Sequence, residues 1–298
     1  MNIVKLCLTL CLGILIVACA AANRPFPSRF GVKVPVIMYH RIVADDFKRP
    51  VLSKHDDAGL YIRTESEFKK EMAYLADNDY TPISLYQLRD YLLSKDPKLL
   101  PAKPVVITFD DGSSDWFEIV FPTLAAHNFK ATFFLITDDE SRRKYLSDST
   151  PLAWNRIQQM AGYKSNAAAN LFNFESHTHT HRNLSAALAE IHKDTNNGPI
   201  IVRHELAESM KAIEEKTGRR PRFLALPYGG GGWDAQPDSR TFPVIKSIAR
   251  EIGYYGIRTS RRDIPNDLTT DPYRLGAQIT MLSITSYDQF VQRLKSFE

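Results

Sequence analysis

Two adjacent carboxylates, Asp110 and Asp111, follow directly after five strand-forming residues and precede a glycine. A buried carboxylate is costly without a partner, and neighbouring residues of a strand point to opposite faces. The pair therefore predicts two different roles, one residue that acts on a substrate and one that binds a metal ion. Further along, the chain offers three imidazoles within five positions, at His177, His179 and His181.

His177 and His181 are four positions apart, and on a helical turn this spacing places both imidazoles on one face. A catalytic divalent metal usually has three protein ligands and one position open to water. The sequence therefore predicts a metal site formed by Asp111, His177 and His181. His179 would point elsewhere on such a turn, where a surface or supporting hydrogen bond is expected. The alternative is a polar loop of partly exposed histidines that binds nothing.

These side chains must be positioned by the segments before them, which alternate between strand-like and helix-like patterns. Such alternation favours a parallel α/β architecture. His40, Asp110, His177 and Tyr228 each follow a predicted strand, as active-site residues of β/α barrels do. No glycine-rich phosphate loop follows the first strand, which argues against a dinucleotide-binding open sheet. We therefore expect a distorted or incomplete (β/α) barrel in a single domain.

The predicted elements follow from hydrophobic spacing and from capping residues. Two long segments, 45–60 and 137–170, lack periodicity and are predicted to be irregular surface insertions near the site. Strands are predicted at 35–39, 105–109, 131–136, 171–175, 223–226, 254–258 and 275–281, and helices at 64–78, 84–94, 115–127 (with an interruption at Pro122), 203–217, 242–252 and 286–297.

The composition sets limits on the function. A chain of 298 residues with 44% hydrophobic residues can form one large domain with a substantial core. The net charge is +4 and the isoelectric point about 8.8, but lysine and arginine form no long runs. Nucleic-acid binding would need a concentrated basic stripe, so we expect no nucleic-acid partner.

The N-terminus resembles a bacterial lipoprotein signal. An apolar run of 12 residues follows Lys5, the length of a signal-peptide core, and ends in the tetrapeptide I-V-A-C at Cys19. This tetrapeptide resembles a lipobox, in which cleavage precedes a cysteine that is then lipidated. We expect a signal peptide at 1–18, a tether at 19–33 after lipidated Cys19, and the catalytic domain at 34–298. A plain secretory signal or an uncleaved anchor is the alternative.

The cysteines agree with this interpretation. They are Cys7, Cys11 and Cys19, so the expected mature chain has no free thiol. Disulfides, a cysteine zinc site and a cysteine nucleophile are thereby excluded, and a metal must be held by histidines and carboxylates. Ala20 carries no retention signal of the aspartate type. We therefore expect a lipid-anchored protein of the cell envelope, at the periplasmic face of the outer membrane.

Together the two motifs resemble those of the NodB-like polysaccharide deacetylases, carbohydrate esterase family 4. The family's T-F-D-D-G and H-[ST]-x-x-H motifs both occur in full, and the resemblance runs from about Val34 to the C-terminus. It implies that Asp110 is the general base and that Asp111 binds the metal with His177 and His181. The implied cofactor is one divalent ion, zinc or else nickel, cobalt or iron.

Two other family motifs are changed. The third, usually R-P-P-Y-G, keeps Pro227, Tyr228 and Gly229 but lacks the arginine that normally contacts the base. That contact must come from elsewhere in this chain. The late motif, Leu-x-x-His, which carries the catalytic acid, is also missing, because no histidine follows His204.

An early histidine offers a replacement for the missing acid. The M-Y-H sequence that ends at His40 resembles the signature of a circularly permuted subgroup, which acts on poly-β-1,6-N-acetylglucosamine in biofilms. The resemblance implies that His40 protonates the leaving amine. A core histidine that is hydrogen-bonded to backbone is the alternative.

Residues near the third motif are expected to bind the sugar, since sugar faces pack on aromatic rings. The expected set is Pro227, Tyr228, Gly229 and Trp233. Trp116 is a further aromatic residue, for which ordinary core packing is favoured.

The leading hypothesis is a metal-dependent hydrolase that removes N-acetyl groups from an exported polysaccharide, poly-β-1,6-N-acetyl-D-glucosamine, for biofilm matrix. Its expected partners are this polymer and, through the lipid anchor, a membrane, with the exopolysaccharide export machinery as a further candidate. One alternative is a deacetylase of chitooligosaccharide, peptidoglycan or xylan with the same fold. A second is a non-catalytic glycan-binding lipoprotein that keeps a metal site.

Overall fold

The computed structural model describes residues 31–48, 61–146, 149–164, 170–189, 197–230, 240–281 and 283–298. The predicted lipidation site Cys19, the signal peptide and Trp233 lie outside these residues, as does most of the segment 45–60. Among the described helices, none combines the length and the hydrophobicity needed to cross a bilayer.

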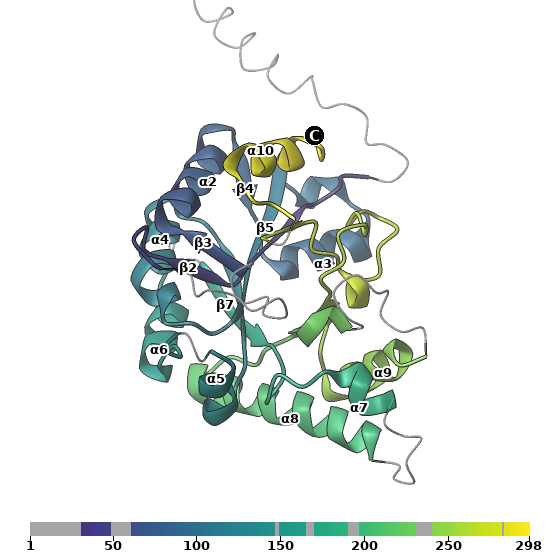
Figure 1. Cartoon of the computed structure of the whole chain (residues 1–298). Coiled ribbons are helices and arrows are strands. Elements are labelled where there is room, and N and C mark those ends of the chain that lie inside the picture. The colour runs from purple at the N-terminus through teal and green to yellow at the C-terminus, as the bar shows by residue number, and fades with distance from the viewer. Residues whose placement is uncertain are drawn as a thin grey trace, which may run out of the picture.

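A curved sheet of eight parallel strands forms the centre of the molecule, in the order β10-β1-β5-β6-β7-β8-β9 with β4 beside β5 (Figure 1). The sheet does not close on itself, which confirms the predicted incomplete barrel. A separate parallel pair joins β2 and β3. The strands are β1 Val36–Tyr39, β2 Arg41–Val43, β3 Ile62–Thr64, β4 Tyr80–Pro82, β5 Lys103–Asp111, β6 Ala131–Leu135, β7 Phe172–Ser176, β8 Phe223–Ala225, β9 Gly256–Arg258 and β10 Ile279–Thr280.

Helices pack round the outside of the sheet, with α2 beside α10 and with α8 beside both α7 and α9 (Figure 1). Local signals fix many of their ends. Thr64 and Ser84 form capping boxes at the starts of α2 and α3, and Gly218 ends α8 in the left-handed conformation. The helices are α2 Glu65–Asp77, α3 Leu85–Ser94, α4 Phe121–Ala126, α5 Asp139–Tyr145, α6 Trp154–Gly162, α7 Leu184–Ala189, α8 Gly198–Thr217, α9 Phe242–Ile252 and α10 Tyr287–Lys295.

Two predicted segments differ from the structure. The region 137–170 was expected to be irregular, but it contains α5 and α6. Helix α5 has one buried residue, Arg142, and therefore shows no apolar stripe. Of the strand predicted at 275–281, only β10 forms. Leu275 makes one further β-bridge, to Arg258. The helix predicted at 115–127 is continuous through Pro122, which lies in the first turn of α4, and the irregular part is a π-helical turn over Trp116–Val120 just before it.

The register of the sheet aligns the chemical residues. Phe109, Phe133 and Phe174 pair across β5, β6 and β7, and neighbouring rings stack at centroid distances of 5.0 and 5.2 Å. Tyr39 pairs with Phe109 on the other side. The next residues along β1 and β5, His40 and Asp110, therefore emerge side by side at the carboxyl end of the sheet. This row of aromatic rings forms the apolar base beneath His40 and Asp110.

Candidate metal centre and catalytic site

The acidic pair ends β5 with a sharp change of backbone direction. Asp110 and Asp111 are 3% and 4% exposed. Asp111 has φ +89° and Gly112 has φ +107°, in the region that favours glycine. A non-glycine residue held there indicates that its surroundings fix it, and such residues concentrate at functional sites. The turn separates the two carboxylates, so that each has its own partners.

The histidine motif lies in an irregular loop after β7. The helical turn expected from the spacing is wrong, because Thr178 (φ +66°) and His181 (φ +59°) adopt left-handed conformations. The two imidazoles nevertheless lie close together as predicted, because the rings of His177 and His181 are 4.8 Å apart. The side chain of His179 turns away to the Thr137 hydroxyl, with 3.0 Å between its Nδ1 and that oxygen.

A buried carboxylate of α8 shapes this loop. Glu205 Oε2 accepts hydrogen bonds from the backbone N–H groups of His179 and Thr180 at 3.0 and 2.8 Å, and Oε1 accepts from the Thr180 hydroxyl. Backbone groups buried in an irregular loop must find such partners. Glu205 thus holds the loop in the shape that brings His177 and His181 together. The sequence does not single out this residue, because a glutamate within a helix carries no local signal.

We expect Glu205→Gln to weaken metal binding by about tenfold to a hundredfold, as loss of the groups that orient metal ligands commonly does. The amide keeps one acceptor oxygen but cannot serve all three donors. Zinc affinity measured by competition with a chromophoric chelator tests this. Glu208→Gln removes the same charge from the next turn of α8 and should leave the affinity unchanged. Equal affinities in both variants would show that Glu205 does not position the loop.

Asp111 and the two histidines form a compact set of ligand atoms, all within 4.8 Å of one another. Asp111 Oδ1 lies 3.4 Å from His177 Nε2 and 3.6 Å from His181 Nε2. His177 Nδ1 lies 2.9 Å from the Ala225 carbonyl oxygen and must donate to it, so in the neutral ring Nε2 carries a lone pair. Asp111 Oδ1 is buried and has no hydrogen bond among the described residues. Lone pairs that face a carboxylate oxygen at this range repel unless a cation lies between them.

The protonation states agree with a cation site. Burial and the neighbouring His177 lower the pKa of His181 to about 3, so its imidazole is neutral at pH 7. Burial alone would raise the pKa of Asp111, but the neighbouring His177 and the other imidazoles nearby hold that pKa well below its ordinary value. One carboxylate oxygen and two imidazole nitrogens suit a divalent ion and leave coordination positions open. The residues present therefore fit the metal that the motifs imply.

The other carboxylate is paired with an arginine. Arg258, at the end of β9, forms a buried ion pair with Asp110 Oδ2. Its guanidinium also lies 5.1 Å from the centre of the Phe134 ring. Arg258 supplies the contact to Asp110 that the changed third motif lacks. The sequence did not single out this residue, although it ends the strand predicted at 254–258.

His40 lies next to this ion pair. Its Nε2 is 4.0 Å from Asp110 Oδ2, and its ring is 4.3 Å from the ring of Tyr61. Burial lowers the pKa of His40, and the charges of Asp111 and Asp110 partly offset this effect. The Trp116 indole donates to the His40 carbonyl oxygen at 2.8 Å, so Trp116 is a buried support of the loop, as favoured, rather than a sugar platform. His40 Nδ1 has no hydrogen bond within the part of the chain described, which counts against a core histidine bonded to backbone.

The expected substrate-binding residues lie beside His181. Pro227 and Gly229 are buried in the turn after β8, and Tyr228 is 38% exposed with its ring 5.0 Å from that of His181. Trp233 lies outside the described residues. Tyr145, which the sequence did not single out, also packs on this ligand, with its ring 3.9 Å from the His181 ring. Two tyrosines thus contact one candidate metal ligand.

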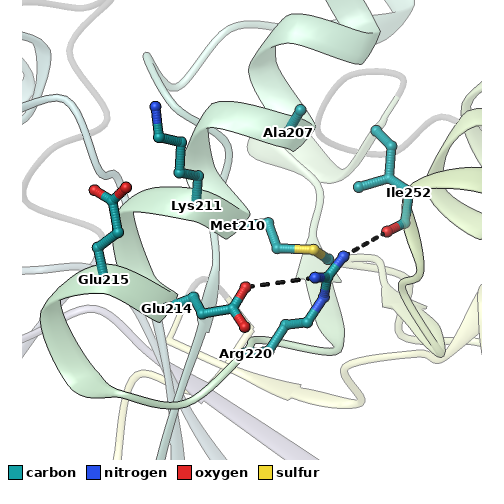
Figure 2. Close-up of a pocket in the computed structure, with 7 residues that line it drawn as sticks. All are labelled: Ala207, Met210, Lys211, Glu214, Glu215, Arg220 and Ile252. Atoms are coloured by element: carbon teal, nitrogen blue, oxygen red, sulfur yellow. Dashed lines mark hydrogen bonds and ion pairs between the residues drawn. The ribbon is translucent and has the colours of Figure 1, made fainter.

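A pocket of about 370 Å³ on the outer side of α8 is not part of this site (Figure 2). Arg220 spans it, paired with Glu214 and bonded to the carbonyl oxygen of Ile252. Arg220 comes shortly before β8 begins, whereas the cluster residues follow the strand ends. The pocket therefore opens at the opposite end of the sheet from the acidic pair.

Comparison with known proteins gives a consistent result. A family model described as polysaccharide deacetylase matches residues 98–251. YxkH of Bacillus subtilis, which has a polysaccharide deacetylase name, is 26% identical over 199 residues, which are 66% of this chain and 57% of that protein. The match thus spans less than two thirds of that relative. A poly-β-1,6-N-acetyl-D-glucosamine N-deacetylase of Staphylococcus aureus is 25% identical over 219 residues, 72% of this chain and 69% of the relative.

Solved structures share the fold. IcaB from Ammonifex degensii superposes with a TM-score of 0.65 at 22% identity, over 89% of this chain and 98% of the other. The deacetylase PplD of Streptococcus pyogenes, solved with acetate, gives 0.63 at 20% identity, over 88% and 98%. At this identity the likeness establishes the architecture, a parallel sheet curled into an incomplete barrel.

Proposed function

This chain belongs to the polysaccharide deacetylase family, and from that premise we propose that it removes N-acetyl groups from a glucosamine polymer by metal-dependent hydrolysis. The observation that carries the proposal is the arrangement around Asp111. Two imidazole nitrogens face its unpartnered oxygen, while Asp110 and His40 lie beside this set. A cation site next to a carboxylate and an imidazole has the parts that amide hydrolysis requires.

Each side chain has a defined task in this mechanism. A divalent ion held by Asp111, His177 and His181 would polarise the amide carbonyl and make a bound water more acidic. Asp110 accepts the proton of the attacking water, and the ion pair with Arg258 fixes the orientation of its carboxylate. His40 donates a proton to the nitrogen as the carbon–nitrogen bond breaks, because an amine leaves poorly without one. The products are acetate and a free amine on the sugar.

Poly-β-1,6-N-acetyl-D-glucosamine is the polymer we favour. The name of the Staphylococcus aureus relative and the early M-Y-H motif support it. Acetate release should be measured on this polymer and on chitin oligomers side by side, with and without a chelator. Faster acetate release from the β-1,6 polymer supports this assignment. Faster release from chitin oligomers would instead indicate a chitooligosaccharide deacetylase of the same fold. No acetate from any N-acetylated glycan with added Zn²⁺, Co²⁺ or Ni²⁺ would favour a glycan-binding protein without catalysis.

We expect His40→Ala to lower turnover by about 10²- to 10⁴-fold, the range for loss of a general acid, while the metal stays bound. In this mechanism His40 donates a proton and does not bind the metal, so its loss should lower turnover without lowering metal content. Metal stoichiometry by elemental analysis and kcat from acetate release test both points. His127→Ala, a histidine packed on Phe129 away from the cluster, is the control. A metal content that falls to zero in the His40 variant would instead make His40 a ligand.

The location proposed is the cell envelope, with a lipid anchor at Cys19 and the periplasmic face of the outer membrane as the site of action on exported biofilm polymer. The I-V-A-C sequence supports this. Cys19→Ala should move the protein from the membrane fraction to the soluble or uncleaved fraction and abolish its labelling by a fatty-acid analogue. Unchanged labelling in that variant would contradict the anchor.

A further inference from the structure

The pairing of strands does not fix the backbone at His40. Tyr39, the last residue of β1, pairs with Phe109 in the central sheet. Arg41 begins β2, which pairs with β3 in a separate sheet. His40 lies between the two strands and belongs to neither. A proton donor must be held close to the nitrogen that it protonates, because a displacement of about 1 Å can lower a rate about a hundredfold. Contacts outside the sheets are therefore needed to hold this residue.

Asp115 contacts the residue that follows His40. Its Oδ2 accepts a hydrogen bond from Arg41 Nε at 2.9 Å and another from the Ser113 hydroxyl at 2.8 Å. The side chains of Arg41 and Asp115 are 10% and 17% exposed, so the ion pair is largely shielded from solvent. The Arg41 guanidinium also lies 5.1 Å from the centre of the Phe47 ring. Shielding from water strengthens the attraction between the two charges, and the pair therefore restrains the start of β2.

Helix capping does not account for Asp115. This residue stands directly before the π-helical turn Trp116–Val120, at a position where an aspartate commonly accepts a hydrogen bond from a backbone N–H of the first turn. The Asp115 side chain makes no such capping bond. Its carboxylate reaches Arg41, on a different segment, instead. The role of this carboxylate is therefore to connect two segments and not to begin its own helix.

The next residue, Trp116, holds His40 directly. The Trp116 indole N–H donates to the His40 carbonyl oxygen at 2.8 Å, and the ring is fully buried in the core. Asp115 and Trp116 come four and five positions after Asp111. The segment that follows the acidic pair therefore contacts both the backbone of His40 and the side chain of Arg41. The candidate acid is thus tied to the same turn that carries the candidate base and a metal ligand.

We propose that Asp115, acting through Arg41, is a positioning residue for the general acid His40. The ion pair fixes the junction of β1 and β2 relative to the turn that carries Asp110, and so holds the imidazole near the nitrogen that leaves. This inference rests on the proposed deacetylase function and adds to it a residue that acts through another. Loss of the Asp115 carboxylate should therefore impair the protonation of the leaving amine and spare the metal site.

A double-mutant cycle on kcat for acetate release from the N-acetylated polymer tests this. We expect Asp115→Ala to lower kcat by about tenfold to a hundredfold when His40 is present. In the His40→Ala background the same change should lower kcat by less than about twofold, because no acid remains to be positioned. Asp115→Asn keeps an oxygen that can accept from Arg41 and should recover part of the loss. Equal fold losses in the two backgrounds would overturn the positioning role.

The leaving group gives a second readout. The phenolate of p-nitrophenyl acetate departs without a proton, so the chelator-sensitive hydrolysis of this ester does not need a general acid. Asp115→Ala should therefore keep the ester rate within about twofold of wild type while it loses the polymer rate. A merely structural defect would lower both rates together, and equal losses on the two substrates would overturn the proposal.

Asp271→Ala is the matched control, because it breaks the ion pair of another aspartate, with Lys246. Asp271 precedes Pro272, whose carbonyl oxygen packs against Gly256 at the amino end of β9, the end of the sheet away from the cluster. This variant should keep both rates, and both aspartate variants should keep the metal content of wild type. Failure of wild type to release acetate from the polymer would overturn the deacetylase function and this inference with it.

Discussion

Asp110→Asn is expected to lower acetate release by about 10²- to 10⁴-fold while the protein still binds metal and polymer. The amide has nearly the shape of the carboxylate but cannot accept the proton of the attacking water. The three metal-ligand candidates are unchanged in this variant. The measurement is kcat for acetate release from the N-acetylated polymer, together with metal content and polymer binding by sedimentation.

The Asp110 variant also breaks a buried ion pair, which must be separated from the chemical effect. Arg258 loses its charged partner, and an uncompensated buried charge destabilises a protein by about 3–5 kcal/mol. Glu71→Gln is the matched control, because it breaks the buried pair between Glu71 and Arg63 at 2.9 Å while its other partner, the Tyr39 hydroxyl, can still donate to the amide oxygen. If the two variants lose similar stability but only the Asp110 variant loses turnover, the loss is chemical. Retention of more than a tenth of the wild-type rate would mean that Asp110 is not the base.

The architecture and the acidic pair could be predicted because their signals are local. Five strand-forming residues that end in two carboxylates indicate a buried strand with chemistry at its end, and β5 has this form. The helices predicted to begin at Thr64 and Ser84 do begin there, and both residues are N-caps in the structure. Parallel strands then bring His40 and Asp110 together through the register of β1 and β5. Each of these predictions depends on a pattern within a few residues, or on the rule that the carboxyl ends of parallel strands lie at one edge of the sheet.

The parts that were missed depend on contacts between distant segments. The H-x-x-x-H spacing suggested a helical turn, but the loop is shaped by Glu205 from α8 and closes through left-handed residues. The partner of Asp110 lies 148 positions away, at Arg258. Tyr145 belongs to a short polar helix whose single buried residue, Arg142, is charged. Hydrophobic periodicity cannot identify such residues, because their roles depend on contacts with distant segments and not on the neighbouring sequence.

His181→Ala is expected to reduce bound metal from about one ion per chain to near zero and to bring acetate release to the chelator-treated background. Only Asp111 and His177 then remain to hold the ion, and two protein ligands bind a divalent metal far more weakly than three. The test needs a readout that does not depend on activity. Ligands that bind only the folded state stabilise it by about 2.7 kcal/mol at a concentration of a hundred times Kd, so added Zn²⁺ should raise the Tm of wild type. The same addition should leave the Tm of the variant unchanged.

His179→Ala separates the metal site from a general effect of losing a histidine in this loop. His179 lies two residues from His181, but its ring turns to the Thr137 hydroxyl instead of Asp111. This variant should keep its metal and the zinc-dependent rise in Tm. Loss of metal from His179→Ala together with its retention in His181→Ala would reverse the two assignments. Because the two side chains differ in direction and not in chemistry, this comparison isolates the geometry on which the metal site depends.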